Sequence, residues 1–453
     1  MLRFLESLQF VLFIFFTAAY AYQFVYLAVG LFGKGKQVRQ DAKLHRYAAI
    51  ISARNEEGVI GDLVKSLKAQ NYPAHLLDVF VVADNCTDST ASVARKAGAT
   101  VYERFNKVQV GKGYAMDWLF HRIFEDKGEQ TYDAFLVFDA DNLVDPNFVR
   151  EMNKMFDTGE YAALTSYRNS KNFCDNWISA GYALWFLREA RFLNRPRTQL
   201  GVNCAVSGTG FLIAGDVIRE DGGWPYYLLT EDIEFSIACA VRGRKIGYCG
   251  TAVVYDEQPV QFRQSWDQRM RWSKGFYQVD AKYTAPLLHG CTRGGKRGAS
   301  CYDMLMTVAP CNLVTIGVLG LALFACLSSL SQPAFITYRV LRMLGRIILT
   351  TLRGVSFSLL LFGAFTMAAE WKKIKGETWK KILYVFLWRR LSERLNGNRS
   401  VMAWPRHRRK KNAHKEYNRS KRETLLQVLL QQRFFYCWMR CGPPPAYSSR
   451  RIA

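Results

Sequence analysis

The sequence lacks both of the glycine-rich motifs with which many nucleotide-binding folds hold phosphate. No Gly-x-Gly-x-x-Gly follows the first apolar, strand-like segment, and no glycine-rich loop ends in Lys-Ser or Lys-Thr. Gly111-Lys112-Gly113 is too short to replace either motif. These absences argue against a dinucleotide-dependent oxidoreductase and against a P-loop enzyme.

The sequence also lacks cysteines at the spacing of a zinc site. Its 11 cysteines are scattered, and Cys437 and Cys441 form an isolated pair near the C-terminus. Most of the others lie in apolar surroundings, as Cys239 and Cys249 do. Scattered thiols of this kind are typical of a reduced, cytosolic compartment.

Acidic residues are few compared with basic ones, 38 against 62, and the formal charge is +24. Residues 372–453 hold 22 Lys and Arg against 4 Asp and Glu, which accounts for +18. We expect residues 388–453 to form a basic, disordered tail. Anionic lipid headgroups are the favoured partner, because the run follows apolar segments. A solvated tail without a partner is the simpler alternative, and nucleic acid is not expected.

Three apolar segments are long enough to cross a bilayer, which takes about 20 helical residues. They are residues 8–32, 304–330 and 347–369. A cleaved signal peptide is the alternative for the first, but its apolar run is long and no clear cleavage site follows. Lys34, Lys36 and Arg39 come next, and the positive-inside rule therefore places the following domain in the cytosol. We predict a multi-pass protein of the plasma membrane.

Residues 45–285 alternate between short apolar runs and amphipathic segments. Strands are predicted at 48–52, 79–83 and 134–138, and helices at 59–67 and 88–97. This order predicts an α/β domain with a parallel sheet covered on both faces. Such sheets bind ligands outside the carboxyl ends of their strands. Polar clusters follow three strands, and together they predict one site: Arg54-Asn55-Glu56, Asp84-Asn85 and Asp139-Ala140-Asp141.

Asp139 and Asp141 form the acidic cluster that most strongly indicates a metal site. Alternate residues of an extended chain point to the same side, so the two carboxylates lie together. Such hard oxygen ligands suit Mg²⁺ or Mn²⁺ bridging a diphosphate. An Asp-rich turn without a ligand is the simpler alternative for the pair taken alone.

Two further acidic residues, Asp84 and Asp232, are candidates for the site. Asp84 ends a predicted strand, where its carboxylate can accept hydrogen bonds from a base or ribose. Thr230-Glu231-Asp232 begins a predicted helix that runs to Val241. Acids at a helix start favour its dipole, which is the structural interpretation. The functional one makes Asp232 the general base that deprotonates an acceptor hydroxyl.

Gln268, Arg271 and Trp272 share a helical face on a basic amphipathic stretch, residues 262–278. The guanidinium of Arg271 matches phosphate oxygens, and the Trp272 ring offers a flat surface to a sugar. An interfacial helix lying along the membrane surface is the alternative, and both roles are compatible. Ser207-Gly208-Thr209-Gly210 allows a ligand to approach the backbone closely, or forms a turn only.

Taken in order along residues 47–278, these motifs resemble family 2 glycosyltransferases, and within them the membrane-integrated cellulose, hyaluronan and poly-N-acetylglucosamine synthases. Each motif is weak alone, and seven in the same order are specific. The resemblance implies a GT-A fold, a UDP-sugar donor and inversion at the anomeric carbon. It also implies a role for each motif residue: Ala53, Glu56 and Asp84 on the nucleoside, Lys112, Asp139, Gln268 and Arg271 on the donor, Asp139 and Asp141 on Mg²⁺ or Mn²⁺, Gly208, Thr209, Glu231 and Trp272 on the acceptor, and Asp232 as base.

The expected reaction is the transfer of a sugar from UDP-N-acetylglucosamine or UDP-glucose to a growing polysaccharide at the membrane. A glycolipid synthase that adds one sugar to a lipid acceptor is the alternative, because the same motifs serve both. A non-catalytic membrane scaffold that keeps the fold is a third possibility, against which the intact acidic motifs argue.

Overall fold

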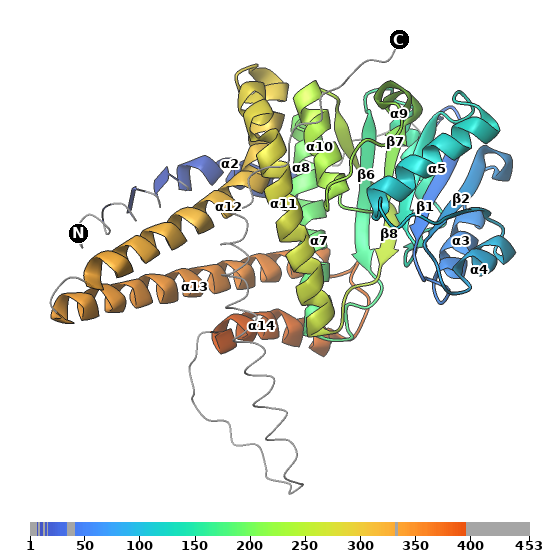
Figure 1. Ribbon diagram of the computed structural model, residues 1–453. Coiled ribbons are helices and arrows are strands. Elements are labelled where there is room, and N and C mark those ends of the chain that lie inside the picture. Colours follow the sequence, from blue (N-terminus) through green and yellow to red (C-terminus); the bar gives the residue numbers. More distant parts are fainter. Residues whose placement is uncertain are drawn as a thin grey trace, which may run out of the picture. The chain divides into compact units, whose positions relative to one another are not determined.

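The computed structural model describes residues 17–33, 41–330 and 334–395, together with a few single positions before residue 17. Its centre is one eight-stranded sheet flanked by helices (Figure 1). The strands follow one another across the sheet in the order β3-β2-β1-β4-β7-β6-β8-β5. Their bounds are β1 Tyr47–Ala53, β2 Leu77–Asp84, β3 Thr100–Arg104, β4 Ala134–Asp139, β5 Leu143–Val144, β6 Ala163–Ser170, β7 Phe211–Ala214 and β8 Ile246–Asp256.

The sheet is parallel in its first half and mixed in its second, where β6 and β8 run parallel to each other. Strands β3, β2, β1 and β4 run parallel to one another, as the alternation of strands and helices predicted. Strand β7 then lies antiparallel to both β4 and β6, and β5 lies antiparallel to β8. The parallel sheet predicted from the strands at 48–52, 79–83 and 134–138 is therefore confirmed for those strands, and β7 reverses the direction beyond them.

Helices cover both faces of this sheet, as predicted. Their bounds are α3 Ile60–Lys68, α4 Thr90–Lys96, α5 Lys112–Lys127, α6 Phe148–Phe156, α7 Trp177–Glu189, α8 Arg195–Leu200, α9 Gly215–Asp221, α10 Glu231–Arg242 and α11 Phe262–Cys291. A short 3-10 helix, η1 Ala74–Leu76, precedes β2, and one π-helical turn, η2 Ala190–Asn194, joins α7 to α8.

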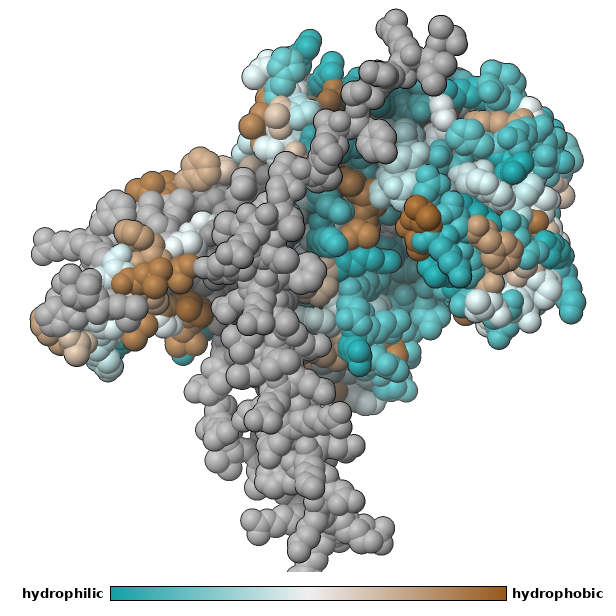
Figure 2. All heavy atoms as spheres, in the orientation of Figure 1, coloured by the Kyte–Doolittle hydropathy of each residue, from teal (hydrophilic) through white to brown (hydrophobic). Residues whose placement is uncertain are grey.

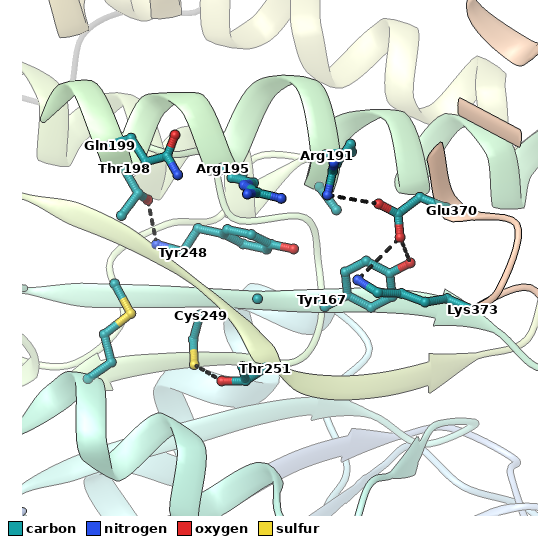
Figure 3. A pocket seen from close by; sticks show the side chains of 13 residues that line it. Tyr167, Arg191, Arg195, Thr198, Gln199, Tyr248, Cys249, Thr251, Glu370 and Lys373 are labelled. Atoms are coloured by element: carbon teal, nitrogen blue, oxygen red, sulfur yellow. Dashed lines mark hydrogen bonds and ion pairs between the residues drawn. The ribbon is translucent and has the colours of Figure 1, made fainter. Parts of the chain in front are cut away.

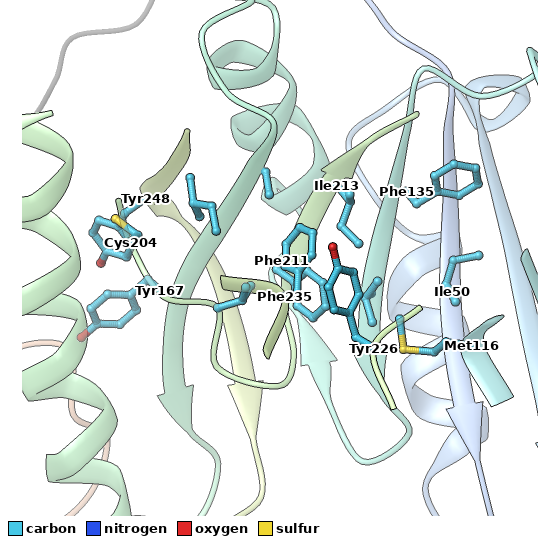
Figure 4. Packing of buried hydrophobic residues seen from close by; sticks show 14 of the residues in the cluster. Ile50, Met116, Phe135, Tyr167, Cys204, Phe211, Ile213, Tyr226, Phe235 and Tyr248 are labelled. Carbon is cyan, nitrogen blue, oxygen red and sulfur yellow. The ribbon is translucent and has the colours of Figure 1, made fainter. Parts of the chain in front are cut away.

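Alternation along β1 divides the core into two layers. Ala48 and Ile50 pack with Leu119 and Phe120 of α5 on one face, part of the cluster drawn in Figure 4. Tyr47, Ala49 and Ile51 pack on the other face with residues of α3 and α6. Every second side chain of a strand points to the same face, so a strand that is apolar throughout needs helices on both sides.

Four further helices lie outside the sheet domain: α2 Tyr22–Phe32, α12 Gly295–Leu330, α13 Ala334–Glu370 and α14 Thr378–Leu395. The predicted spans 8–32, 304–330 and 347–369 fall on α2, α12 and α13 where they are described. No helix among the described residues is both long enough and apolar enough to span a membrane. Figure 2 shows apolar side chains on the outer parts of α12 and α13, which include the exposed Phe324, Leu327 and Phe335.

Two predicted boundaries differ from the structure. The interfacial helix expected at residues 262–278 begins at Phe262 but continues to Cys291 as α11. The tail expected from residue 388 begins within a helix, because α14 extends to Leu395. The rest of the predicted tail lies outside the described residues.

A buried ion pair joins the sheet domain to α12. Arg197 of α8 donates to both carboxylate oxygens of Asp303, at 2.7 and 3.1 Å. The hydroxyls of Tyr22 and Tyr26 on α2 donate to the same carboxylate, at 2.9 and 3.0 Å. One carboxylate therefore connects three segments that are far apart in the sequence.

Candidate active site

The strands place the predicted acidic clusters at one edge of the sheet. Register pairs Ser52 of β1 with Asp139, the last residue of β4. Asn55 and Asn85 follow β1 and β2 with φ of 57° and 54°, a left-handed conformation that asparagine tolerates and that turns the chain sharply there. Glu56 lies near enough to Asp139 for that carboxylate, after burial, to raise the pKa of Glu56.

Lys112 neutralises Asp139 at the centre of this edge. Its ammonium group donates to Asp139 Oδ1 at 2.5 Å and to the carbonyl oxygen of Gly208 at 2.6 Å. Burial works against the charged lysine, but Asp139 and Glu231 outweigh burial and raise the pKa of Lys112. Because α5 begins at Lys112, the start of this helix supplies the cation.

Gly208 brings Asp232 and Asp139 to the same place. A methyl group built on Gly208 would lie 3.7 Å from Asp232 Oδ2 and 3.9 Å from Asp139 Oδ2. The glycine has φ of +75°, as a tight turn requires. The second residue of α10 and the last residue of β4 therefore place carboxylate oxygens within 4 Å of one point in space.

Burial raises the pKa of both acids at the start of α10. It raises the pKa of Glu231 to about 7, and the neighbouring Asp232 adds to the effect. Burial is also the main reason why the pKa of Asp232 is raised. Thr230 stands at the N-cap position, but its side chain makes no capping hydrogen bond. The structural interpretation of this motif therefore depends on the acids in the first turn and the helix dipole alone.

Asp141 belongs to a second acidic group beside the first. Asn142 donates to Asp141 Oδ1 at 3.1 Å and to Asp256 Oδ1 at 2.9 Å. Burial, followed by Asp256 and Asp139, raises the pKa of Asp141 to about 7. Arg168 donates to Asp256 Oδ2 through Nε at 2.9 Å and so supplies one compensating positive charge. The carboxylates are crowded in a way that an added cation would relieve.

Thr209 joins the two acidic groups. The backbone N–H of Asp139 donates to the Thr209 hydroxyl at 2.9 Å, and that hydroxyl donates to Asn142 Oδ1. Thr209 is almost fully buried. Thr209 therefore fixes the position of Asp139 relative to Asn142 from within the core. It was predicted to contact an acceptor.

Asp84 lies at the end of β2, and its carboxylate is already paired. Arg104 donates to Asp84 Oδ1 at 2.6 Å, with 4% and 6% of the two side chains exposed. The partner comes from β3, where register places Arg104 directly beside Asp84. Ala53 ends β1 next to Ala83 of β2, so the positions predicted for the nucleoside adjoin one another.

Helix α11 carries the Gln268-x-x-Arg271-Trp272 motif and is fixed against the start of α10. A methyl group on Gly275 would lie 2.5 Å from Thr230 Cγ2, so only glycine allows this approach. Trp272 packs against Tyr182 and Phe186 of α7, with ring centroids 5.8 and 6.5 Å apart. The structure records no contact between this motif and the carboxylates of Asp139 or Asp232 among the described residues.

Three residues of the site were not predicted: Asn142, Arg168 and Asp256. Asp256 ends the apolar run of β8 in the way that Asp139 ends β4, so the same signal could have found it. Arg168 lies in the polar half of β6 and does not end an apolar run, so the sequence gives no such signal for it. Its guanidinium lies 3.7 Å from the ring centroid of Phe186, and Phe186 also contacts Trp272.

The acidic residues fit a divalent cation only in part. Among the described residues no group of three or more His, Cys, Asp or Glu side chains is arranged to hold a metal ion. Asp139 and Asp141 each keep one oxygen, Oδ2, without a hydrogen bond to a described residue, and these oxygens can ligate Mg²⁺ or Mn²⁺. Other ligands would have to come from a phosphate-bearing substrate and water.

The α/β fold and the cluster of acids at its strand ends define a nucleotide-sugar-binding domain of the GT-A type. Residues 45–275 match the family described as "Glycosyltransferase like family 2". The match covers half of the chain, and the chain belongs to this family. The resemblance found from the seven motifs is thus confirmed.

Relatives of this chain have two kinds of product. Beta-monoglucosyldiacylglycerol synthase of Synechocystis is 27% identical over 229 residues, 51% of this chain and 47% of the relative. Poly-beta-1,6-N-acetyl-D-glucosamine synthase of Staphylococcus aureus is 24% identical over 234 residues, 51% and 54% of the two chains. The chain spans about half the length of the curated relatives it matches.

A solved structure supports the fold. The chain is similar to a mannosyltransferase from Pyrobaculum calidifontis in complex with GDP-Man and Mn²⁺, with a TM-score of 0.51 and 16% identity. The similarity covers 79% of this chain and 95% of the mannosyltransferase. At this identity it supports the GT-A architecture alone.

Proposed function

We propose that this protein transfers a sugar, with inversion, from a UDP-sugar to a growing polysaccharide at a membrane. UDP-N-acetylglucosamine and UDP-glucose are the two donors we favour. The observation that carries the proposal is the convergence of Asp139 and Asp232 on Gly208, within 4 Å of one point. The anomeric carbon of the donor would lie there, between a diphosphate held through a metal ion at Asp139 and an acceptor hydroxyl beside Asp232.

Asp232 is the proposed general base. It takes the proton of the acceptor hydroxyl while the oxygen bonds to the anomeric carbon and the bond from that carbon to UDP breaks. A base works best when its pKa approaches the working pH, and burial raises the pKa of Asp232 in that direction. Attack from the side opposite UDP inverts the anomeric carbon.

The proposed metal ligands are the Oδ2 atoms of Asp139 and Asp141. A bound Mg²⁺ or Mn²⁺ supplies positive charge against the diphosphate as it leaves. Lys112 neutralises Asp139 in the structure described here, and we assign its ammonium group to the donor phosphates. Arg271 is exposed and Gln268 is half-buried, and we assign both to the donor diphosphate.

The remaining predicted residues are assigned by their positions. Ala53, Glu56 and Asp84, at the ends of β1 and β2, are proposed to hold the nucleoside. Gly208, Thr209, Glu231 and Trp272 are proposed to shape the acceptor site. In this assignment Thr209 acts through Asp139 and Asn142, because it is buried behind them.

We retain the proposal that residues 8–32, 304–330 and 347–369 are transmembrane helices and that the catalytic domain is cytosolic. Exposed apolar side chains on α12 and α13, such as Phe324 and Phe335, support contact with lipid acyl chains. Lys372, Lys373 and Lys375 follow the third segment and support a cytosolic C-terminal end.

A glycolipid synthase that transfers one sugar to a lipid acceptor is the second candidate. The similarity to beta-monoglucosyldiacylglycerol synthase favours it. The same base and the same donor site would serve a diacylglycerol hydroxyl as well as a sugar hydroxyl. The two candidates differ in the acceptor and in whether the product stays bound for another transfer.

Purified membranes containing the full chain, incubated with each radiolabelled UDP-sugar with and without Mn²⁺, provide the test. A polymer that grows with time supports the synthase, and a product that stops at one sugar per lipid supports the second candidate. Asp139→Asn and Asp232→Asn should each lower transfer at least 100-fold. Asp216→Asn, in which an 80% exposed side chain is changed, is the matched control and should keep full transfer. Full transfer by both site variants would overturn the assignment.

A further inference from the structure

A cavity lies away from the proposed active site, between the sheet and the C-terminal end of α13 (Figure 3). Its volume is about 240 Å³. Tyr167 of β6 and Tyr248 of β8 form one wall, η2 and α8 form another, and Glu370 and Lys373 close it. Tyr167 is adjacent in sequence to Arg168, but Tyr167 contacts Glu370 of α13 whereas Arg168 contacts Asp256 of the active site.

The cavity is positively charged overall. Arg191, Arg195 and Lys373 line it, against the single carboxylate of Glu370. That carboxylate is only 1% exposed, and it accepts from the Tyr167 hydroxyl at 2.8 Å through Oε2. Lys373 lies 3.2 Å from the same oxygen. One cation is thereby matched, and the two arginines remain as excess positive charge.

Several polar atoms of the cavity have no partner among the described residues. The Nε atoms of Arg191 and Arg195 are buried without a hydrogen bond, and so is Glu370 Oε1. The Nη1 atom of Arg191 is 3.8 Å from Glu370 Oε1, which is too far for a hydrogen bond. The Tyr248 hydroxyl makes no hydrogen bond with the other residues drawn in Figure 3. Buried polar groups are nearly always satisfied, so this concentration of unsatisfied donors beside one acceptor points to a missing ligand.

We propose that this cavity binds a phosphate group that carries a neighbouring hydroxyl, as in a glycerol phosphate. The phosphate oxygens accept from the unpartnered guanidinium N–H groups of Arg191 and Arg195. The hydroxyl donates to Glu370 Oε1. A bare anion would leave Glu370 Oε1 without a donor, and an uncharged alcohol would leave the two guanidinium groups unmatched.

The position of the cavity favours a lipid headgroup as the source. Arg195 donates to the carbonyl oxygen of Gly33, the residue that directly follows α2, and Glu370 is the last residue of α13. Two of the three proposed membrane helices therefore end at the cavity. The residues that follow α2 and α13 in the sequence are basic: Lys34 and Lys36 follow α2, and Lys372 follows α13. Anionic headgroups collect where such residues meet a membrane.

The test measures thermal unfolding of the full chain in an uncharged detergent. The added probes are sodium phosphate, glycerol 1-phosphate and short-chain phosphatidylglycerol, with short-chain phosphatidylcholine and sodium chloride as blanks. A ligand that binds the folded state alone raises the melting temperature with its concentration. A rise with glycerol 1-phosphate supports a free phosphate ester as a source, and a rise with phosphatidylglycerol alone supports the headgroup. No rise above both blanks leaves a water-filled cavity and overturns the proposal.

Three variants make the result specific to this cavity. Arg191→Met removes a charge-assisted hydrogen bond and should weaken the apparent affinity of the active probe about ten-fold or more. Lys373→Gln changes a side chain that is 51% exposed, so this variant is expected to fold, and it should weaken affinity by a smaller factor. Arg150→Met, on the exposed side of α6, should leave the affinity unchanged. Equal affinities in wild type, Arg191→Met and Lys373→Gln would overturn the proposal.

The proposal does not depend on the catalytic assignment. Asp141→Asn alters the acidic site and should not change the response to glycerol 1-phosphate or phosphatidylglycerol. A response lost in Asp141→Asn but kept in Arg191→Met would place the probe in the active site and refute the second site. The transfer assay with labelled UDP-sugar separately decides the proposed function.

Discussion

The ion pair between Arg197 and Asp303 should be among the most sensitive positions in the chain, and Arg197→Met tests it. Both side chains are 2% exposed, and the guanidinium holds both carboxylate oxygens. Methionine keeps much of the volume of the side chain but removes the charge. Asp303 would then be left buried with hydrogen bonds from Tyr22 and Tyr26 and without a counter-charge.

The magnitude follows from the burial. Removing one partner of a buried ion pair costs about 3–5 kcal/mol, because the remaining charge is neither solvated nor matched. The two tyrosine hydrogen bonds remain in the variant, so we place the cost toward the lower end of this range. For a large domain each kcal/mol lowers the melting temperature by about 2–4 °C. A decrease of at least 6 °C is therefore expected, at roughly 3 kcal/mol.

The assay is thermal unfolding of the full chain in detergent, followed by intrinsic tryptophan fluorescence. Arg122→Met is the matched control, because Arg122 pairs with Glu125 at 2.8 Å with 49% and 60% of the side chains exposed. An exposed pair contributes about 0–1 kcal/mol, and this control should shift the melting temperature little. The double variant Arg197→Met/Asp303→Leu replaces both charges and should recover much of the lost stability.

Two results would refute the reasoning. If Arg197→Met shifted the melting temperature no more than Arg122→Met, the pair would not be buried in solution. If the double variant were as unstable as Arg197→Met alone, the cost would come from lost packing and not from an unmatched charge at Asp303.

Two more predictions concern packing and titration. In Gly113→Ala the new methyl group would clash with the carbonyl oxygen of Tyr226. We therefore expect the free energy of unfolding, measured with denaturant, to fall by about 1–3 kcal/mol. Gly58→Ala, where no atom lies within 4 Å of the new methyl group, is the control and should be nearly neutral. Burial, followed by Asp232, raises the pKa of Glu231 from 4.5 to about 7. The folded state thus keeps a proton that the unfolded state has released, so stability falls as the pH rises through this window. Melting temperatures in EDTA between pH 4.5 and 7 should show wild type losing stability relative to Glu231→Gln, and parallel curves would contradict the shift.

The first half of the sheet could be predicted from sequence because its strands are buried on both faces. Residues 48–52, 79–83 and 134–138 are almost wholly apolar runs, and the structure extends each by at most two residues at either end. The second half was missed for the opposite reason. Strand β6 reads Ala-Leu-Thr-Ser-Tyr-Arg-Asn-Ser, and its polar half serves the site and the cavity. A four-residue strand such as β7 is too short for any periodicity to be detected.

The site was partly predictable for a related reason. Acids at strand ends are visible in sequence, and Asp139, Asp232 and Lys112 do come together. Their partners are not visible, because pairing across strands depends on register. Arg104 lies 20 residues after Asp84 and reaches it only because β3 pairs with β2 at that position. Asp256 reaches Asn142 across 114 residues in the same way.

In the motif on α11, helical periodicity predicted which residues share a face, whereas tertiary packing determines which of them are buried. Helical spacing predicted one shared face for Gln268, Arg271 and Trp272, but the structure half-buries Gln268 and Trp272 and leaves Arg271 exposed. Trp272 and Gly275 anchor the helix, against α7 and Thr230 respectively. Gln268 Oε1 is buried without a hydrogen-bond partner among the described residues. An anchored helix that presents one unpaired amide oxygen and one exposed guanidinium is prepared to receive a ligand that carries both hydroxyl and phosphate groups. A hydroxyl can donate to the amide oxygen, and the phosphate can accept from Arg271, without moving the helix.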